Sequence, residues 1–235
     1  MLEKLMYWSW LPIVQLYIWL HLKLDVIRHQ PLPPGPKIIV ANHPTTLDPY
    51  FVSRLIQEPA RILIIYLAFR IPVLGPWLRL GGHIEVAPGE GRRAFDAALA
   101  ALAEGKNIMI FPEGDLSPSK GPGKAHNGAA RLALLSGAPV IPLGIHLPPN
   151  GIRQVSGEIG GESTITRWPR HTPYAVTVGE SIAFAGDATD RERVQAVTDE
   201  IMRHIRSLAQ ESKARLQPQP VTPRGLVQSV RLPEG

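Results

Sequence analysis

A histidine and an aspartate that follow a short β-branched run have the residue types of a general base and its orienting carboxylate. In the stretch IIVANHPTTLDPYF (38–51), His43 ends the run and Asp48 follows five residues later. On one regular helix this spacing would place the two side chains about 140° apart around the axis, out of contact. Pro44 disfavours helical dihedrals at His43, so we expect His43 to lie in a turn before a helix, with its imidazole folded back toward Asp48. The carboxylate would then fix the tautomer and leave the other ring nitrogen able to accept a proton.

Asp48 also has an ordinary structural explanation. An aspartate followed by a proline suits the start of a helix, with Asp48 as cap and Pro49 at the first helical position. Thr45 lies three residues before Asp48, which is the spacing of a capping box. These residues alone leave both interpretations open.

Other motifs exclude several kinds of chemistry. The sequence holds no Cys, no G-x-S-x-G nucleophile motif, and eight His without metal-ligand spacing, so neither a disulfide nor a metal site is expected. GPGKA around Lys124 departs from a phosphate-binding loop because no Ser or Thr follows the lysine. No pattern of aromatic and basic residues suggests nucleic-acid binding. The net charge of +5 favours an anionic partner, such as a phospholipid surface or a phosphorylated substrate.

The candidate pair must be positioned by strands and helices that alternate along the chain. Apolar runs predict strands at 37–41, 61–68, 83–87, 107–111, 139–147 and 174–184, and periodic segments predict helices at 48–57, 91–105, 127–137 and from about 189. This alternation indicates an α/β fold with a mostly parallel central sheet flanked by helices. Strand ends of such a sheet meet at one edge, which would bring Asn42 and His43 close to Glu113 and Gly114. Residues 148–173 are rich in Gly and Pro and are predicted to form a long loop.

The N-terminal stretch predicts a hydrophobic membrane-anchoring helix. Residues 5–22 are nearly free of charge and contain Trp8, Trp10 and Trp19. As a helix the stretch would extend roughly 27 Å, which is marginal against a hydrocarbon core of ~30 Å. We therefore expect it to dip into one leaflet rather than to cross, with a buried core helix as the alternative. Trp77 and Leu78, in a Pro- and Gly-rich segment, are expected to touch the membrane as well.

Three regions follow from this pattern. Residues 1–30 are assigned to the membrane anchor and residues 31–216 to one folded domain. Residues 217–235 are assigned to a disordered Pro-rich tail.

Four blocks in order resemble the membrane-associated glycerolipid acyltransferases, typified by bacterial 1-acyl-glycerol-3-phosphate acyltransferase. NHPTTLD (42–48) is similar to the first block of that family, with four residues between His and Asp. FRIPVLGPWLRLGGHIEV (69–86), FPEGDLS (111–117) and PVIPLGI (139–145) are similar to the second, third and fourth blocks. The resemblance extends over about residues 37–146 and makes catalysis the preferred interpretation of Asp48.

The resemblance implies an O-acyltransferase. His43, oriented by Asp48, would take a proton from a lipid hydroxyl, which then attacks the thioester of acyl-CoA or acyl carrier protein. The acceptor would be 1-acyl-glycerol-3-phosphate in phospholipid synthesis. No cofactor, metal or nucleic acid is implied, and the location would be the cytoplasmic face of the bacterial inner membrane. The substrate-binding residues implied are Asn42, Glu113, Gly114, Lys124 and Pro142.

Two departures from the family pattern concern the acceptor. Asp115-Leu116 replaces the usual Thr-Arg of the third block, and Ala87-Pro88 stands where the second block presents an arginine. The family's arginines are associated with the phosphate of the acceptor, and a guanidinium is hard to replace. Candidate substitutes are Arg92, Arg93, Lys124 and Arg131. The alternatives are a lipid or glycolipid acceptor without phosphate, an inactive lipid-binding homologue, or a thioesterase-like hydrolase.

Overall fold

A seven-stranded sheet forms the centre of the computed structural model, which describes residues 2–56, 58–117 and 125–217. The order across the sheet is β1-β9-β6-β2-β5-β3-β4. Its strands are β1 (Leu22–Arg28), β2 (Ile38–Ala41), β3 (Ala60–Ile65), β4 (Ile84–Val86), β5 (Asn107–Ile110), β6 (Val140–His146) and β9 (Thr172–Val178). Every neighbouring pair is parallel except β6 and β9, which run antiparallel. The predicted α/β fold with a mostly parallel sheet is confirmed.

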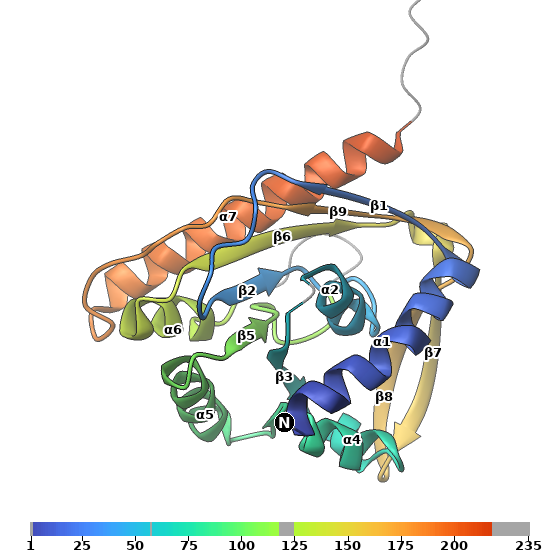
Figure 1. Ribbon diagram of the computed structural model, residues 1–235, viewed down its shortest axis with the longest axis horizontal. Coiled ribbons are helices and arrows are strands. Elements are labelled where there is room, and N and C mark those ends of the chain that lie inside the picture. Colours follow the sequence, from blue (N-terminus) through green and yellow to red (C-terminus); the bar gives the residue numbers. More distant parts are fainter. Residues whose placement is uncertain (1, 57, 118–124, 218–235) are drawn as a thin grey trace, which may run out of the picture.

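Helices cover both faces of the sheet and bury alternate residues of its strands (Figure 1). On one face α1 (Leu2–His21) and α2 (Asp48–Ile56) pack over residues such as Ile39 and Met109. On the other face α5 (Gly91–Ala103), α6 (Gly128–Ser136) and α7 (Arg191–Leu216) pack over residues such as Ile38 and Ile108. Adjacent residues of a strand point to opposite faces, so these runs must be apolar throughout.

One edge of the sheet gathers the segments that matter for the site. β2 and β5 are parallel neighbours, with Val40 opposite Ile110, so the loops after both strands leave at the same edge. Because β9 runs antiparallel to β6, the beginning of β9 lies at this edge as well. The topology therefore brings the His43 loop, the Glu113 loop and the first residues of β9 together.

The N-terminal segment is more integrated into the domain than its sequence indicated. α1 leads directly into β1, which pairs in parallel with β9, so residues 22–28 form an edge strand although they were assigned to the anchor. Leu11, Val14 and Ile18 are buried against the domain, as a core helix would be. Among the described residues, no helix combines the length and the apolar character needed to cross a membrane.

The prediction of a long loop at 148–173 is wrong. After a short 3-10 helix (Pro149–Gly151), strands β7 (Ile152–Ile159) and β8 (Glu162–Pro169) form a two-stranded antiparallel hairpin. Gly160 and Gly161 connect them with φ of 59° and 83°, a conformation that glycine adopts without a steric penalty. A Gly-Gly pair between two alternating segments is itself a hairpin signal.

The expectation that Leu78 touches a membrane is also wrong. Residues 66–80 form two short helices, α3 (Tyr66–Arg70) and α4 (Leu74–Leu80), and Leu78 is fully buried. The Trp77 ring packs against Trp10 of α1, with ring centroids 5.0 Å apart. This aromatic contact joins α4 to α1. Residues 218–235, most of the predicted tail, lie outside the described residues.

Candidate active site

His43 and Asp48 meet in the loop between β2 and α2. Nδ1 of His43 lies 3.0 Å from Oδ2 of Asp48. The Asp48 side chain is fully buried, whereas the His43 side chain is 17% exposed. Because a carboxylate only accepts hydrogen bonds, the proton is assigned to Nδ1, which leaves Nε2 on the opposite side of the ring as the acceptor. The pair has the geometry of a general base with its orienting carboxylate.

Further donors hold the Asp48 carboxylate in place. Thr45 donates to it twice, from its backbone N–H to Oδ2 at 2.6 Å and from its hydroxyl to Oδ1 at 2.5 Å. The Tyr174 hydroxyl donates to Oδ1 at 2.6 Å. Burial raises the pKa of Tyr174 well above its usual value, and the adjacent Asp48 carboxylate adds to this effect. The hydroxyl therefore stays protonated and remains a donor. These bonds compensate a buried charge that would otherwise be costly.

Asp48 has a structural role at the start of α2 as well as a contact with His43. Asp48 is the first residue of α2 rather than the cap before it, and its carboxylate accepts the backbone N–H of Thr45 in the preceding turn. The carboxylate nevertheless contacts His43 through the same oxygen. One side chain thus organises the start of α2 and orients the imidazole.

The loop after β5 supports His43 from its other side. Phe111 stacks on the imidazole, with ring centroids 4.3 Å apart and planes 24° from parallel. The His43 N–H donates to Oγ of Ser117 at 2.8 Å, and the Ser117 N–H donates to the His43 carbonyl at 2.8 Å. Backbone and ring of His43 are therefore both fixed before any substrate binds, which is what a positioned base requires.

Two of the predicted substrate-binding residues make structural contacts. The Asn42 side chain donates to the Ile145 carbonyl at 2.9 Å and accepts from the Ile145 N–H at 2.8 Å, so it ties the end of β2 to β6. Pro142 is buried within β6 opposite Val40, and its ring lies near Gly179. Val40 and Val140 belong to the core on the α7 side of the sheet. Residues two apart in a strand point to the same face, so Pro142 faces this side as well.

Glu113 and Gly114 lie in the turn that follows Phe111. Glu113 is buried, and the Gly114 N–H donates to the Phe111 carbonyl at 3.0 Å. Gly114 has φ of 71°, and a Cβ at this position would come within 2.8 Å of the His126 ring. The turn therefore needs glycine for its conformation and for this close approach. Lys124, the remaining predicted residue, lies outside the described residues.

Three of the four substitutes considered for the missing arginines lie within the described residues, at exposed positions of helices. Arg92 pairs with Asp96 and Arg93 with Glu90, both at the beginning of α5. Arg131 is exposed on α6. Asp115 is exposed too, and its carboxylate accepts the N–H of Leu116 at 2.7 Å.

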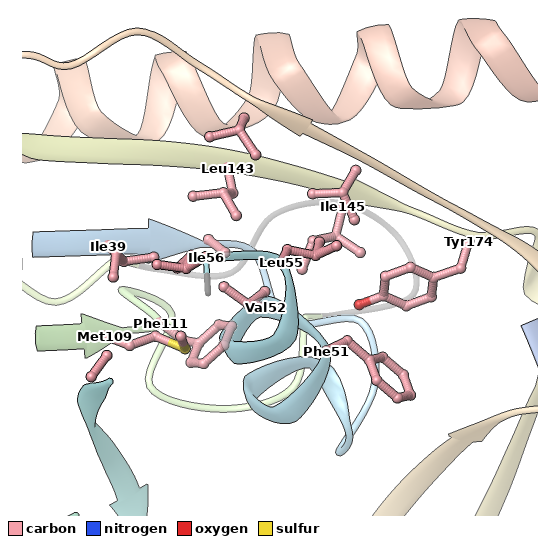
Figure 2. Packing of buried hydrophobic residues seen from close by; sticks show 14 of the residues in the cluster. Ile39, Phe51, Val52, Leu55, Ile56, Met109, Phe111, Leu143, Ile145 and Tyr174 are labelled. Carbon is pink, nitrogen blue, oxygen red and sulfur yellow. The ribbon is translucent and has the colours of Figure 1, made fainter. Parts of the chain in front are cut away.

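Sequence reasoning missed the contributions of Tyr174 and Ser117. Figure 2 shows the Tyr174 ring reaching from β9 toward the helix that carries Phe51 and Val52. No local spacing links Tyr174 to Asp48, because the contact depends on β9 returning antiparallel to β6. Ser117 belongs to a block that the sequence did identify, but its bond to the backbone of His43 depends on β2 and β5 being neighbours.

The fold and the site together define an α/β protein with a hydrogen-bonded His–Asp pair at the carboxyl edge of its parallel strands. The family model described as Acyltransferase matches residues 23–146, more than half of the chain, and the chain belongs to this family. The predicted family is confirmed.

Two curated relatives share one name. The chain is 31% identical over 126 residues to a 1-acyl-sn-glycerol-3-phosphate acyltransferase of Chlamydomonas reinhardtii, a match that covers 52% of this chain and 38% of that protein. It is 27% identical over 135 residues to the 1-acyl-sn-glycerol-3-phosphate acyltransferase of Pseudomonas aeruginosa, covering 54% of this chain and 52% of that protein. The chain thus spans about half or less of the length of these relatives.

A solved structure supports the fold over nearly the whole chain. The crystal structure of the 1-acyl-sn-glycerophosphate acyltransferase PlsC from Thermotoga maritima matches with a TM-score of 0.63 and 19% identity. The match covers 92% of this chain and 81% of PlsC. At this identity the likeness concerns the fold alone.

Proposed function

We propose that this chain transfers a fatty acyl group from a thioester to the free hydroxyl of 1-acyl-sn-glycerol-3-phosphate. The names of the relatives support this acceptor. The single observation that carries the proposal is the 3.0 Å contact between Nδ1 of His43 and a fully buried Asp48 carboxylate. That arrangement supplies a base with one nitrogen directed away from its carboxylate, as acyl transfer to a hydroxyl requires.

The proposed reaction is direct transfer without an acyl-enzyme. Nε2 of His43 removes the proton of the acceptor hydroxyl while the hydroxyl oxygen bonds to the thioester carbonyl carbon. The tetrahedral intermediate collapses, the carbon–sulfur bond breaks, and the imidazolium returns its proton to the departing thiolate. Asp48 stabilises the imidazolium throughout. The products are an ester and a free thiol, and the reaction as proposed needs no cofactor.

The donor in this proposal is acyl-CoA or acyl carrier protein, because either presents the thioester that the reaction consumes. Transfer is tested by incubating purified protein with a labelled acyl-CoA or acyl carrier protein and 1-acyl-sn-glycerol-3-phosphate, and by identifying the lipid product by mass spectrometry. Phosphatidic acid should form. The His43→Ala variant should produce at least ~100-fold less of it, while its circular dichroism spectrum stays that of the parent protein. Unchanged turnover by His43→Ala would remove this residue from the mechanism.

A lipid or glycolipid acceptor without phosphate is the second candidate. Asp115 motivates it, because an exposed carboxylate stands where the family usually has Thr-Arg, and it would repel a phosphate. The same assay in a whole lipid extract separates the candidates, since phosphatidic acid supports the first and an acylated neutral lipid or glycolipid supports the second. Free fatty acid without an added acceptor would indicate a hydrolase, and no product at all would indicate a lipid-binding homologue.

The proposed location is a membrane surface, with α1 lying in the interface. The outward face of α1 carries six large exposed apolar side chains: Leu5, Trp8, Ile13, Leu16, Trp19 and Leu20. Their positions follow helical spacing, opposite the residues that α1 buries against the domain. Such a face suits shallow insertion into one leaflet. For the side of the membrane we propose the cytoplasmic face of the bacterial inner membrane, where acceptor lipid and thioester donor are both available.

A further inference from the structure

An arginine of the β7–β8 hairpin reaches the loop that supports His43. Nη1 of Arg167 donates to the carbonyl oxygen of Ser117 at 2.5 Å. Ser117 in turn exchanges two hydrogen bonds of 2.8 Å with the backbone of His43. One residue therefore separates the guanidinium from the proposed catalytic base.

The backbone of Arg167 is fixed to the same region. The Thr46 N–H donates to the Arg167 carbonyl at 2.9 Å, and the Arg167 N–H donates to the Thr46 hydroxyl at 2.9 Å. Thr46 lies between His43 and Asp48, so the hairpin is joined to the loop that carries the catalytic pair. Because Thr46 holds its backbone and Ser117 binds its guanidinium, Arg167 can present its charge at a defined place.

Some donors of the guanidinium have no partner among the described residues and could serve a ligand. Nη1 binds Ser117 and Nε donates to the Gln154 side chain at 3.3 Å, whereas a guanidinium has five N–H groups in a planar fork. Among the described residues, Arg167 forms no ion pair, in contrast to Arg92 and Arg93. Its charge is therefore not neutralised by a described carboxylate, and it lies beside the site rather than on a remote surface.

We propose that Arg167 binds the phosphate of the acceptor and so holds the acceptor hydroxyl against His43. The inference rests on the proposed function. In 1-acyl-sn-glycerol-3-phosphate the phosphate ester is on the carbon next to the one that carries the free hydroxyl, so one cation near His43 can fix both groups. A guanidinium fork matches phosphate oxygens in a bidentate manner. The loop after β5 carries Asp115-Leu116 and lacks the arginine usual at this place. In this proposal Arg167 of the hairpin supplies the cation instead.

The proposal is tested by comparing two acceptors that differ only in the phosphate. kcat and KM are measured for 1-acyl-sn-glycerol-3-phosphate and for 1-acylglycerol of the same chain length. Arg167→Ala should lower kcat/KM for the phosphorylated acceptor roughly 10- to 100-fold, mainly through KM, and change kcat/KM for 1-acylglycerol less than about threefold. Arg167→Lys should fall between, because it keeps the charge but loses the fork.

Arg153 provides the matched control. It is exposed on β7, one residue from Gln154, so it points to the hairpin face opposite Arg167. Arg153→Ala should leave kcat/KM unchanged for both acceptors. Thermal melting of all variants shows whether each is folded, and Arg167→Lys still tests the phosphate contact if Arg167→Ala melts early.

The outcomes separate this inference from the proposed function. If Arg167→Ala or Arg167→Lys loses activity equally on both acceptors, or keeps full activity on the phosphorylated one, Arg167 does not bind the phosphate and the inference is overturned. If the unmodified protein acylates neither acceptor, the proposed function itself fails. Selective loss on the phosphorylated acceptor supports the inference.

Discussion

Tyr174 donates a 2.6 Å hydrogen bond to Oδ1 of Asp48, although 126 residues separate the two in the sequence. The contact exists because β9 runs antiparallel to β6, so that the beginning of β9 lies beside the loop after β2. Both side chains are fully buried. In the proposed mechanism the tyrosine therefore acts as a positioning residue, because it holds the carboxylate that contacts His43.

Replacing Tyr174 by Phe should lower kcat about tenfold and leave KM for the acceptor nearly unchanged. The phenyl ring keeps the packing against Phe51, and only the hydroxyl donor to Asp48 is lost. A hydrogen bond to a charged group is worth about 1.5–3 kcal/mol, part of which will be lost as stability. Steady-state kinetics together with urea unfolding measure both effects.

Tyr17 offers the control for this substitution. Its hydroxyl donates to the Pro169 carbonyl at 2.8 Å, and its ring also stacks near Phe51, but it makes no contact with Asp48. Tyr17→Phe should lower stability by about 1 kcal/mol and leave kcat unchanged. Equal effects of the two substitutions on kcat would show that Tyr174 acts through general stability.

Asp48→Asn should lower kcat roughly 100- to 10,000-fold, as the loss of an orienting carboxylate does in other base-assisted acyl transfers. The amide has nearly the same shape but no charge, and its NH2 group cannot accept the hydrogen bonds that Oδ1 or Oδ2 accepts now. Acyl transfer at saturating substrates is the measurement. A variant that keeps most of its turnover would show that Asp48 is not needed to orient His43.

The sequence predicted those parts of the site that depend on local spacing. His43 and Asp48 belong to one loop, and Pro44 alone indicates that the histidine stands outside the helix. The alternation of strands and helices was sufficient to predict the α/β fold, because each strand is a continuous apolar run and each helix has an apolar face. Local rules could not place Tyr174 or Arg167, since both reach the site through an antiparallel return or a hairpin.

The N-terminal segment shows a second limit of sequence patterns. An apolar helix looks alike in sequence whether it faces lipid or protein, and α1 buries one face against the domain while large apolar side chains on its other face are exposed. Likewise the sequence places Asn42 at the end of β2 but does not show that its amide forms two hydrogen bonds with Ile145, on a strand distant in sequence. Only the tertiary partner decides such cases.

Polar substitutions on the outward face of α1 should weaken membrane binding without unfolding the domain. Trp8, Leu16 and Trp19 are 55%, 55% and 75% exposed, and burial of one such side chain contributes about 1.5–3 kcal/mol. Replacing all three by Gln should lower co-sedimentation with anionic phospholipid vesicles at least ~100-fold. Unchanged co-sedimentation would assign the attachment to another surface.

A deletion would be a poorer test of the same point. Removing residues 1–28 also removes β1, whose seven residues pair with β9, and the buried side of α1. Loss of binding after such a deletion would report unfolding as much as loss of the membrane contact. Val14→Gln, at a buried position of α1, is the matched control and should destabilise the domain instead.

Gly114→Ala should destabilise the protein more than Gly105→Ala. Both glycines have positive φ, 71° and 76°, so either alanine incurs the same backbone strain of about 1 kcal/mol. Only at Gly114 would the new Cβ meet another group, the His126 ring at 2.8 Å, while nothing lies within 4 Å at Gly105. The difference between the two free energies of unfolding measures the contact. Equal values would mean that His126 moves away freely.

Stability should fall as the pH is lowered from about 6.5 toward 4, and His83 should account for part of the fall. Burial lowers the pKa of His83 to about 4, against the opposing effect of Glu3. The neutral ring accepts the N–H of Ile62 through Nδ1 at 3.2 Å. Below pH 6.5 His83 is protonated in the unfolded chain, whereas in the folded protein it stays neutral down to about pH 4. Protonation therefore favours unfolding by at most about 3 kcal/mol.

His83→Asn removes this titration. The free energy of unfolding of the variant, measured by urea at intervals between pH 7 and 4, should therefore depend less steeply on pH than that of the parent. Parallel curves for the two proteins would show that His83 is not held neutral in the fold.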